Sequence, residues 1–313
     1  MKKRKMVRTK DMTREEWLRY RRCGIGGSDA SVILGENPWR SVLQLWEEKT
    51  GDGAVTDQGN EYTYWGNVME PIIRKEFMIR TGLKVRQKHA MIFHVMFPFL
   101  FADVDGIVTD ENGEKCIFEA KIASQYKEKD WETGIPKEYY LQVQHYLEVC
   151  GMEKAYVAVL IGGNNFKIYT VIRDREVIAE LLCKEIEFWE EHVLTGIPPV
   201  ADASKATAEY LDSRYCDPVS DSIQLPEDMK EILQAYGKVD ARLKELEKKK
   251  IGLSNKIKAA MEEHEKGEVD GMTVQWKKVE REGLDSKRLK SEKPELFQEY
   301  RSVSSYRRLT VAA

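Results

Sequence analysis

The sequence lacks the residue patterns of a disulfide-stabilised domain and of a zinc module. It contains 5 cysteines in 313 residues, an odd number, and no Cys-x-x-Cys pair. Free thiols are therefore expected. The 5 histidines show no His-Glu-x-x-His or related metal-ligand spacing. His145 is expected to be a half-exposed helix residue rather than a metal ligand.

Long apolar runs are also missing. No segment has the length of a signal peptide or a membrane span, so a cytoplasmic protein without a membrane partner is expected. Charged residues make up 33% of the chain and hydrophobic residues 42%, which is typical of a soluble globular protein. The net charge of −3 excludes a general attraction to DNA, so any such attraction must be local.

The chain is long enough to bury a full core and suggests about two domains. The basic first residues, 1–12, are expected to form a solvated arm. A first domain over 13–199 ends near Gly196-Ile-Pro-Pro199, which stops a predicted helix. Residues 200–226 are polar and are interpreted as a linker. The remaining residues, 227–313, form a separate C-terminal region.

Within 13–199 the hydrophobic periodicity alternates between helical and strand spacing. Helices are predicted over 13–22, 28–34, 41–49, 66–80, 136–150 and 175–194. Strands are predicted over 83–94, 98–108, 115–122, 154–161 and 166–172. Helices that flank a mixed sheet define an α/β fold.

A pair of carboxylates with a lysine is the first candidate site. Asp105 precedes a predicted hairpin whose second strand contains Glu119, Ala120 and Lys121. Side chains alternate along a strand, so Glu119 and Lys121 share one face and Ala120 takes the other. The hairpin can bring Asp105 beside Glu119, and such oxygen ligands suit Mg²⁺ or Mn²⁺. The alternative is a surface ion pair on an exposed strand.

A third carboxylate, Glu70, stands among apolar residues with helical spacing. A carboxylate in such a stripe is unfavourable unless it is paired or binds a metal. The alternative is a glutamate at the edge of the core, paired with Arg74 one turn later.

An inward-facing amide, Gln144, is predicted on the helix that begins near Pro136. It needs a polar partner, which could be a catalytic group or, equally, the backbone of the core.

The segment from Arg21 to Asp29 joins a basic helix end to glycines. Its Gly24-Ile-Gly26-Gly27 run is not a dinucleotide fingerprint, because the preceding residues are helical rather than a strand. A tight turn is expected, with Ser28 or Asp29 capping the next helix. With Arg21 or Arg22 close by, this helix start could bind a phosphate.

Five short motifs in this order resemble the YqaJ-type viral recombinase family, whose best-known relative is the phage lambda exonuclease. They are Gly26-Gly-Ser28-Asp29-Ala30, Gly66-Asn-Val-Met-Glu70-Pro71, Asp105-Gly106, Glu119-Ala120-Lys121 and Gln142-Val-Gln144-His-Tyr146. The resemblance covers roughly residues 14–195. The family belongs to the PD-(D/E)XK nucleases, and Val104 stands where that signature has proline.

The resemblance implies a restriction-endonuclease-like mixed sheet flanked by helices, and it implies a role for each motif. Asp105, Glu119 and the Ala120 carbonyl would hold Mg²⁺, which Mn²⁺ could replace, with help from Glu70. Lys121 would stabilise the attacking hydroxide and the transition state, and Gln144 would position Lys121 or the water. Arg21 and Ser28 would bind a 5′-phosphate on DNA. Arg21 is chosen over Arg22 because it precedes Ser28 by seven residues.

The function expected from the resemblance is a 5′→3′ exonuclease of phage-type recombination, acting on double-stranded DNA. It would leave 3′ overhangs for a single-strand annealing protein, in a bacterial cell and from a phage or prophage gene. A homo-oligomer is implied by the resemblance alone. The alternatives are a structure-specific or nicking endonuclease and a non-catalytic DNA-binding or partner-docking module. The second is disfavoured because Glu70, Asp105, Glu119 and Lys121 are all present.

The C-terminal region begins with a heptad pattern. Apolar positions recur at Ile232, Val239, Leu246, Leu253 and Ala260, offset by Met229, Tyr236, Leu243, Lys250 and Ile257. This pattern predicts a long amphipathic helix that packs on its own domain or self-associates. A small α/β appendage follows, with strands near 272–279 and 306–311 and a helix near 286–300. Its basic residues are expected to be a solvated face, or else to contact DNA or a recombination partner.

Overall fold

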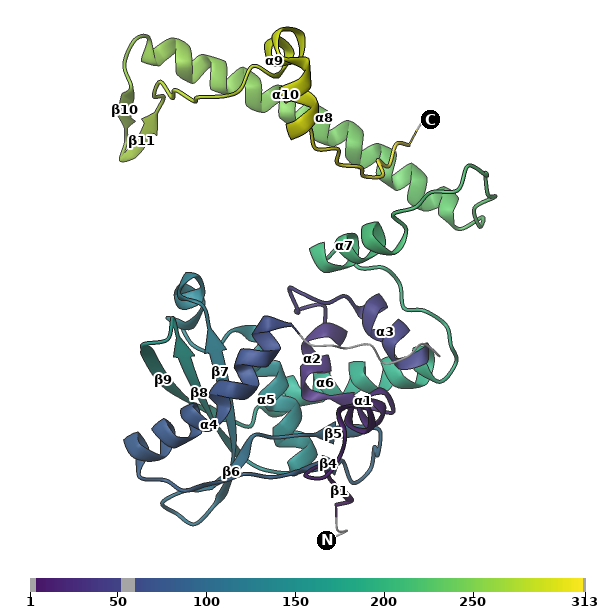
Figure 1. Ribbon diagram of the computed structural model, residues 1–313, viewed down its shortest axis with the longest axis vertical. Helices are drawn as coiled ribbons and strands as arrows, with labels where there is room; N and C mark the ends of the chain where they lie inside the picture. The colour runs from purple at the N-terminus through teal and green to yellow at the C-terminus, as the bar shows by residue number, and fades with distance from the viewer. Residues whose placement is uncertain (1–3, 52–59, 312–313) are drawn as a thin grey trace. The chain divides into compact units, whose positions relative to one another are not determined.

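The computed structural model describes residues 4–51 and 60–311, so the first three residues of the predicted basic arm lie outside the described residues. The chain divides into two compact units between Arg214 and Tyr215 (Figure 1). Within the described ranges no helix is both long and apolar enough to cross a membrane.

The helices of the first unit begin at residues that satisfy free backbone N–H groups. Thr13 and Glu16 form a reciprocal capping box at the start of α1 (Arg14–Arg22). Ser41, Asn60 and Asp174 cap the helices that follow them. The remaining helical elements are α2 (Gly27–Ile33), α3 (Val42–Thr50), α4 (Glu61–Thr81), η1 (Gln125–Trp131), α5 (Lys137–Cys150), α6 (Arg175–Glu187), η2 (Phe188–Val193) and α7 (Lys205–Arg214).

Two sheets organise the described part of this unit. The larger has the order β3-β6-β7-β8-β9, in which β7 and β8 are parallel and the other neighbours antiparallel. The smaller has the order β1-β4-β5-β2, with β2 and β5 parallel. The strands are β1 (Met6–Arg8), β2 (Ile25–Gly26), β3 (Val85–Arg86), β4 (Ala90–Phe93), β5 (Leu100–Ala102), β6 (Gly106–Thr109), β7 (Lys115–Ala123), β8 (Lys154–Ile161) and β9 (Asn165–Ile172).

Helices α4 and α5 cover the two faces of the larger sheet. Phe118 of β7 packs with Phe77 of α4, whereas Ile117 belongs to the core that contains Val143 and Leu147 of α5. Because side chains alternate along β7, Glu119 and Lys121 fall on the α5 face together with Ile117.

Several predictions about the first unit are wrong in detail. The strand predicted over 83–94 is interrupted, since β3 ends at Arg86 in the larger sheet and β4 begins at Ala90 in the smaller one. Met6–Arg8 forms a strand that pairs with β4, so the N-terminal arm is not a free tail over these residues. The strand predicted over 98–108 is interrupted, since β5 ends at Ala102 and β6 begins at Gly106. The predicted linker contains α7, which is tied to α3 by a hydrogen bond from the Tyr210 hydroxyl to Glu47.

The second unit begins with the predicted amphipathic helix, α8 (Met229–Met261). An antiparallel hairpin follows, made of β10 (Lys266–Val269) and β11 (Met272–Gln275), and then α9 (Ser286–Glu292) and α10 (Pro294–Tyr300). The strand predicted near 306–311 is not formed, because these residues have no ladder partner.

Candidate active site

The acidic residues of the site lie where the chain passes from one sheet to the other. Asp103, Val104 and Asp105 connect β5 of the smaller sheet to β6 of the larger. Val104 is buried in the core, and the two aspartates beside it line a common cleft. Apolar Val104 therefore anchors the connection while its neighbours face outward. Val104, which stands where the resembled signature has proline, fills the core.

Strand β7 places Glu119 and Lys121 beside Gln142 of α5. The Lys121 ammonium donates to Glu119 Oε1 at 2.7 Å and to Gln142 Oε1 at 3.1 Å. The Gln142 amide nitrogen donates to the same Glu119 oxygen at 2.9 Å and to the Tyr146 hydroxyl at 3.0 Å. Two side chains, those of Lys121 and Gln142, thus hold Glu119 Oε1, while the buried Glu119 Oε2 has no hydrogen-bond partner among the described residues.

Asp105 is held beside this network by the backbone. Its Oδ2 accepts from the Ala120 N–H at 2.8 Å. Burial and the neighbouring Glu119 carboxylate raise the pKa of Asp105 to about 8. Burial likewise raises the pKa of Glu119, although Lys121 opposes the shift. Two adjacent carboxylates in a poorly solvated site favour a proton or a cation between them.

Lys121 stays charged in spite of its surroundings. Burial alone would lower the pKa of its ammonium, but the Glu119 and Asp105 carboxylates outweigh burial and raise that pKa. The ammonium also lies 5.1 Å from the centre of the Tyr139 ring, within the range of a cation–π contact.

Glu70 is both paired with Arg74 and part of the acidic cleft, the two alternatives considered for it. Its carboxylate accepts from Arg74 at 2.7 Å, the predicted pair one turn later on α4. It also lines the cleft that contains Asp105 and Glu119. Burial and the nearby Asp105 raise the pKa of Glu70, which indicates that its charge is felt in the site.

The donor set fits a hard divalent cation, although the described residues hold no ready-made cluster of three or more acidic, histidine or cysteine ligands. Arg74 and Lys121 each occupy one oxygen of a site carboxylate in this arrangement. The fit rests on Glu119 Oε2, a buried carboxylate oxygen without a hydrogen-bond partner among the described residues. Burying such an oxygen costs free energy unless a cation or a hydrogen-bond donor binds it.

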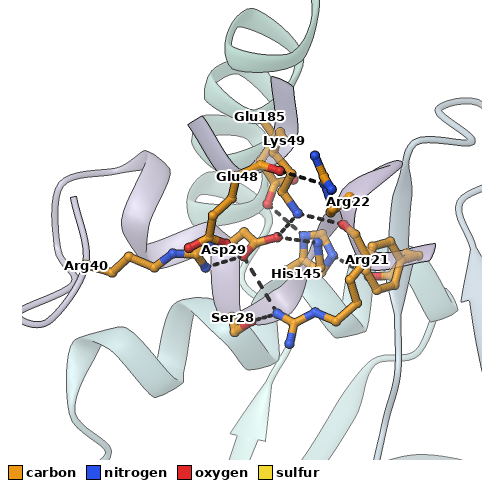
Figure 2. Close-up of polar contacts among 11 residues, drawn as sticks. Arg21, Arg22, Ser28, Asp29, Arg40, Glu48, Lys49, His145 and Glu185 are labelled. Carbon is orange, nitrogen blue, oxygen red and sulfur yellow. Dashed lines mark hydrogen bonds and ion pairs between the residues drawn. The ribbon is translucent and has the colours of Figure 1, made fainter. Parts of the chain in front are cut away.

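Arg21 and Ser28 meet at the other end of the site (Figure 2). The Arg21 guanidinium donates to Ser28 Oγ at 2.7 Å, whereas Arg22 turns to the Glu48 carbonyl oxygen at 3.1 Å. Arg21 is thus the arginine beside Ser28. Asp29 lies 3.9 Å from the Arg21 guanidinium and anchors this corner.

Asp29 is buried and bound by cations from α3 and the loop before it. It accepts from Lys49 at 2.8 Å and from Arg40 at 3.1 Å (Figure 2). Burial would raise the pKa of this carboxyl, but Lys49, Arg40 and Arg21 outweigh burial and hold that pKa well below its usual range. Asp29 also accepts from the Gly26 N–H, so it is the third residue of α2 rather than its cap.

One cleft of about 560 Å³ joins these groups. Of the sequence-predicted residues, Arg21, Ser28, Glu70, Asp105 and Glu119 line it. Lys121 and Ala120 stand behind Glu119 and Asp105, to which they are hydrogen-bonded. The walls also carry the cationic side chains of Arg14 and Lys88 and the imidazole of His89. The cleft therefore offers acidic groups for a cation and basic groups for a polyanion.

The role predicted for Gln144 is wrong. Its side chain is fully buried, donates to the Ile172 carbonyl at 2.9 Å and accepts from the Asp174 N–H at 2.9 Å. The backbone alternative is what the structure shows. Gln142 holds Lys121 instead, because two residues along a helix turn the side chain to another face.

Sequence reasoning missed other parts of the site. His145 is buried rather than half-exposed and bridges Glu185 and the Phe101 carbonyl oxygen. Asp103 accepts from the Trp17 indole at 2.8 Å and lines the cleft. The sequence Asp103-Val104-Asp105 could have predicted this position for Asp103, because alternate residues of an extended chain point to the same side. Trp17 gave no comparable signal.

Comparisons with known proteins show which family the chain is similar to. Residues 16–153 match the model of the YqaJ-like viral recombinase domain. The uncharacterized protein YqaJ of Bacillus subtilis (strain 168) is 41% identical over 310 residues, which cover 98% of this chain and 96% of that protein.

One solved structure shows that the fold is shared. The crystal structure of LHK-Exo in complex with dAMP has a TM-score of 0.50 and 22% identity, covering 64% of this chain and 98% of that one. Another crystal structure of LHK-Exo, an alkaline exonuclease from Laribacter hongkongensis, has a TM-score of 0.48 and 21% sequence identity. This match covers 64% of the present chain and 97% of that one. The predicted restriction-endonuclease-like α/β fold is thereby confirmed. With 41% identity across nearly its whole length, the chain belongs to the YqaJ-like viral recombinase family.

Proposed function

We propose that this chain is a metal-dependent deoxyribonuclease that degrades double-stranded DNA from a 5′-phosphorylated end, in the 5′→3′ direction. The observation that carries the proposal is the buried Glu119 Oε2, which lies beside Asp105 and Lys121 and has no hydrogen-bond partner within residues 4–51 and 60–311. Membership of a viral recombinase family supports it. The fold is shared with LHK-Exo, which is an alkaline exonuclease and was crystallised with dAMP.

Asp105 and Glu119 would hold Mg²⁺, with Glu70 on the facing wall of the cleft and the Ala120 carbonyl as a further oxygen donor. Mn²⁺ has similar ligand preferences and would substitute. When bound, the ion supplies charge neutralisation at the scissile phosphate and lowers the pKa of a water. Asp105 must give up its proton to serve, because its raised pKa leaves it largely protonated at neutral pH.

Lys121 supplies a fixed positive charge next to these carboxylates. An ammonium of this kind stabilises the attacking hydroxide and the charge that develops on the phosphate. Gln142 orients both partners, since it accepts from Lys121 and donates to Glu119. The tight geometry of this triad limits reorganisation during the reaction.

Arg21 and Ser28 would bind the terminal 5′-phosphate. A guanidinium and a hydroxyl 2.7 Å apart can both donate to phosphate oxygens. Both residues line the same cleft as the carboxylates. A terminal phosphate held there would place the following phosphodiester toward the acidic end.

In a recombination system such an enzyme would leave 3′ overhangs for a single-strand annealing protein. It would act as a homo-oligomer on phage or prophage DNA in the bacterial cytoplasm.

Three substrates test the proposal. Linear duplex with 5′-phosphates, the same duplex with 5′-hydroxyls, and a covalently closed circle are incubated with protein and Mg²⁺. Degradation of the first, slower loss of the second and survival of the circle are expected. Nicking of the circle would instead indicate an endonuclease. No cleavage of any substrate in Mg²⁺ or Mn²⁺ would indicate a non-catalytic module.

A further inference from the structure

Helix α8 is too long to be explained by local propensity. Its 33 residues span about 50 Å at 1.5 Å per residue. Gly237 and Gly252 each weaken it by about 1 kcal/mol relative to alanine. A helix of this kind is stable only when one of its faces is packed.

One face carries a continuous seam with alternating spacings of four and three residues. We call this set the seam: Met229, Ile232, Tyr236, Val239, Leu243, Leu246, Lys250, Leu253, Ile257 and Ala260. Its large apolar members between Ile232 and Ile257 are 45% to 62% exposed. Such a stripe is the a/d pattern of a coiled coil.

The rest of the second unit contacts α8 away from most of the seam. Val311 shares a groove with Leu233, Gly237 and Ala241, none of which is a seam residue. The Trp276 ring lies 5.6 Å from the ammonium of Lys258, which is also outside the seam. The chain after β11 runs back along α8 (Figure 1), yet the central seam residues stay open.

The charges that flank the seam select its partner. The residue before the first seam position is basic in three successive heptads, with Arg242, Lys249 and Lys256. The residue after the second seam position is acidic in two, with Asp240 and Glu247. Two identical helices in parallel register place Arg242 of each helix opposite Glu247 of the other, whereas antiparallel helices oppose like charges.

The present partners of these flanking charges are easily exchanged. Arg242 pairs with Glu245 and Lys244 pairs with Asp240 within the helix, and all four side chains are exposed. Exposed pairs of this type contribute little to stability. Arg242 of one helix can therefore turn to Glu247 of a second.

We propose that α8 forms a parallel, in-register, two-stranded coiled coil with α8 of a second copy of this chain. Because charged residues flank the apolar stripe, the stripe is narrow, and a narrow stripe is what a coiled coil of two helices buries. Lys250, a single lysine in the seam, sets register and chain number at some loss of stability. This pairing does not depend on DNA cleavage, so measuring the molecular mass of the protein in solution is enough to test it.

Sedimentation equilibrium of the full chain provides the test. Wild type is expected to contain paired chains, and Leu246→Glu to reduce the mass to half. Ile251→Glu is the matched control, because Ile251 is 62% exposed on the same helix but outside the seam. It should leave the mass unchanged. A Leu246→Glu mass equal to that of wild type, or equal dissociation by both variants with native circular dichroism, would overturn the proposal.

Charge exchange tests the orientation. Arg242→Glu should raise the dissociation constant about tenfold, since it opposes Glu247 twice in a parallel pair. Adding Glu247→Arg should restore wild-type association. Tighter association of the single variant is the antiparallel result and would contradict a parallel pair.

Discussion

At the scale of single residues, two glutamines on one helix have different surroundings. Gln142 bonds to Lys121 and Glu119 in the site, and Gln144 bonds to backbone groups of Ile172 and Asp174. From the sequence, the inward-facing amide was expected at Gln144. The direction of a side chain on a buried helix depends on what packs around it, which a sequence motif does not specify.

The two glutamines form a matched pair for mutation. Gln142→Leu should lower the rate of DNA cleavage by roughly a hundredfold, because Lys121 loses its orientation. Gln144→Leu should lower the free energy of unfolding by about 1–3 kcal/mol, since two backbone groups lose their partner. Cleavage rates and urea denaturation of both variants check this. Equal loss of cleavage in both would contradict the assignment.

Asp105 should make stability depend on pH in metal-free buffer. Its pKa is about 8 in the folded chain, against an ordinary value near 4 when unfolded. Between these values the folded state holds a proton that the unfolded state has lost. The free energy of unfolding therefore falls as pH rises from about 4 to about 8.

Urea denaturation in EDTA at pH 5, 6, 7 and 8 measures this slope. Asp105→Asn removes the titrating group, so its slope should be shallower than that of wild type. Added Mg²⁺ should stabilise wild type more at pH 8 than at pH 6, because a cation replaces the proton. Identical slopes for the two proteins would show that Asp105 titrates normally.

At the scale of elements, most of the first unit was predictable from periodicity. The hairpin β8–β9 and helices α1, α3 and α5 begin and end within one residue of prediction. The exceptions have physical reasons. Residues 103–105 form no strand, because the chain passes there from the smaller sheet to the larger one. Helix α7 was not predicted because the apolar residues of its segment show only weak helical periodicity.

Gly24 and Gly27, which lie immediately before and after β2, allow close packing. A Cβ on Gly27 would lie 2.4 Å from the Tyr146 ring, and one on Gly24 would lie 2.3 Å from the Phe99 carbonyl oxygen. The approach at Gly27 brings α2 against α5, whose Tyr146 hydroxyl accepts from Gln142. The sequence indicated a tight turn but not the aromatic ring that requires it.

Gly27→Ala should therefore lower the free energy of unfolding by about 1–3 kcal/mol through overpacking. Gly66→Ala is the control, because Gly66 lies within α4 with no neighbouring atom within 4 Å of the added carbon. That change should raise stability by up to about 1 kcal/mol. Thermal or urea denaturation compares the two. A neutral effect at Gly27 would show that the Tyr146 ring can move aside.

At the scale of the whole molecule, the chain combines a nuclease-like fold with a separate helical unit. A linker between domains was predicted over 200–226, and the boundary between the two compact units, between Arg214 and Tyr215, falls inside that range. The acidic residues and the lysine predicted from the family motif lie close together, since Asp105 and Glu119 line one cleft and Lys121 donates to Glu119. Its supporting contacts, Trp17 with Asp103 and Lys49 with Asp29, join distant segments and carry no local signal.

The central claim is that Asp105, Glu119 and Lys121 form a metal-dependent nuclease centre. The most direct measurement is cleavage of end-labelled, 5′-phosphorylated linear duplex in Mg²⁺ by wild type, Glu119→Ala and Lys121→Ala. Wild type should degrade the duplex and lose all activity in EDTA. Both variants should bind the duplex and keep native circular dichroism but cleave at least a hundredfold more slowly. Normal digestion by Glu119→Ala would contradict the account.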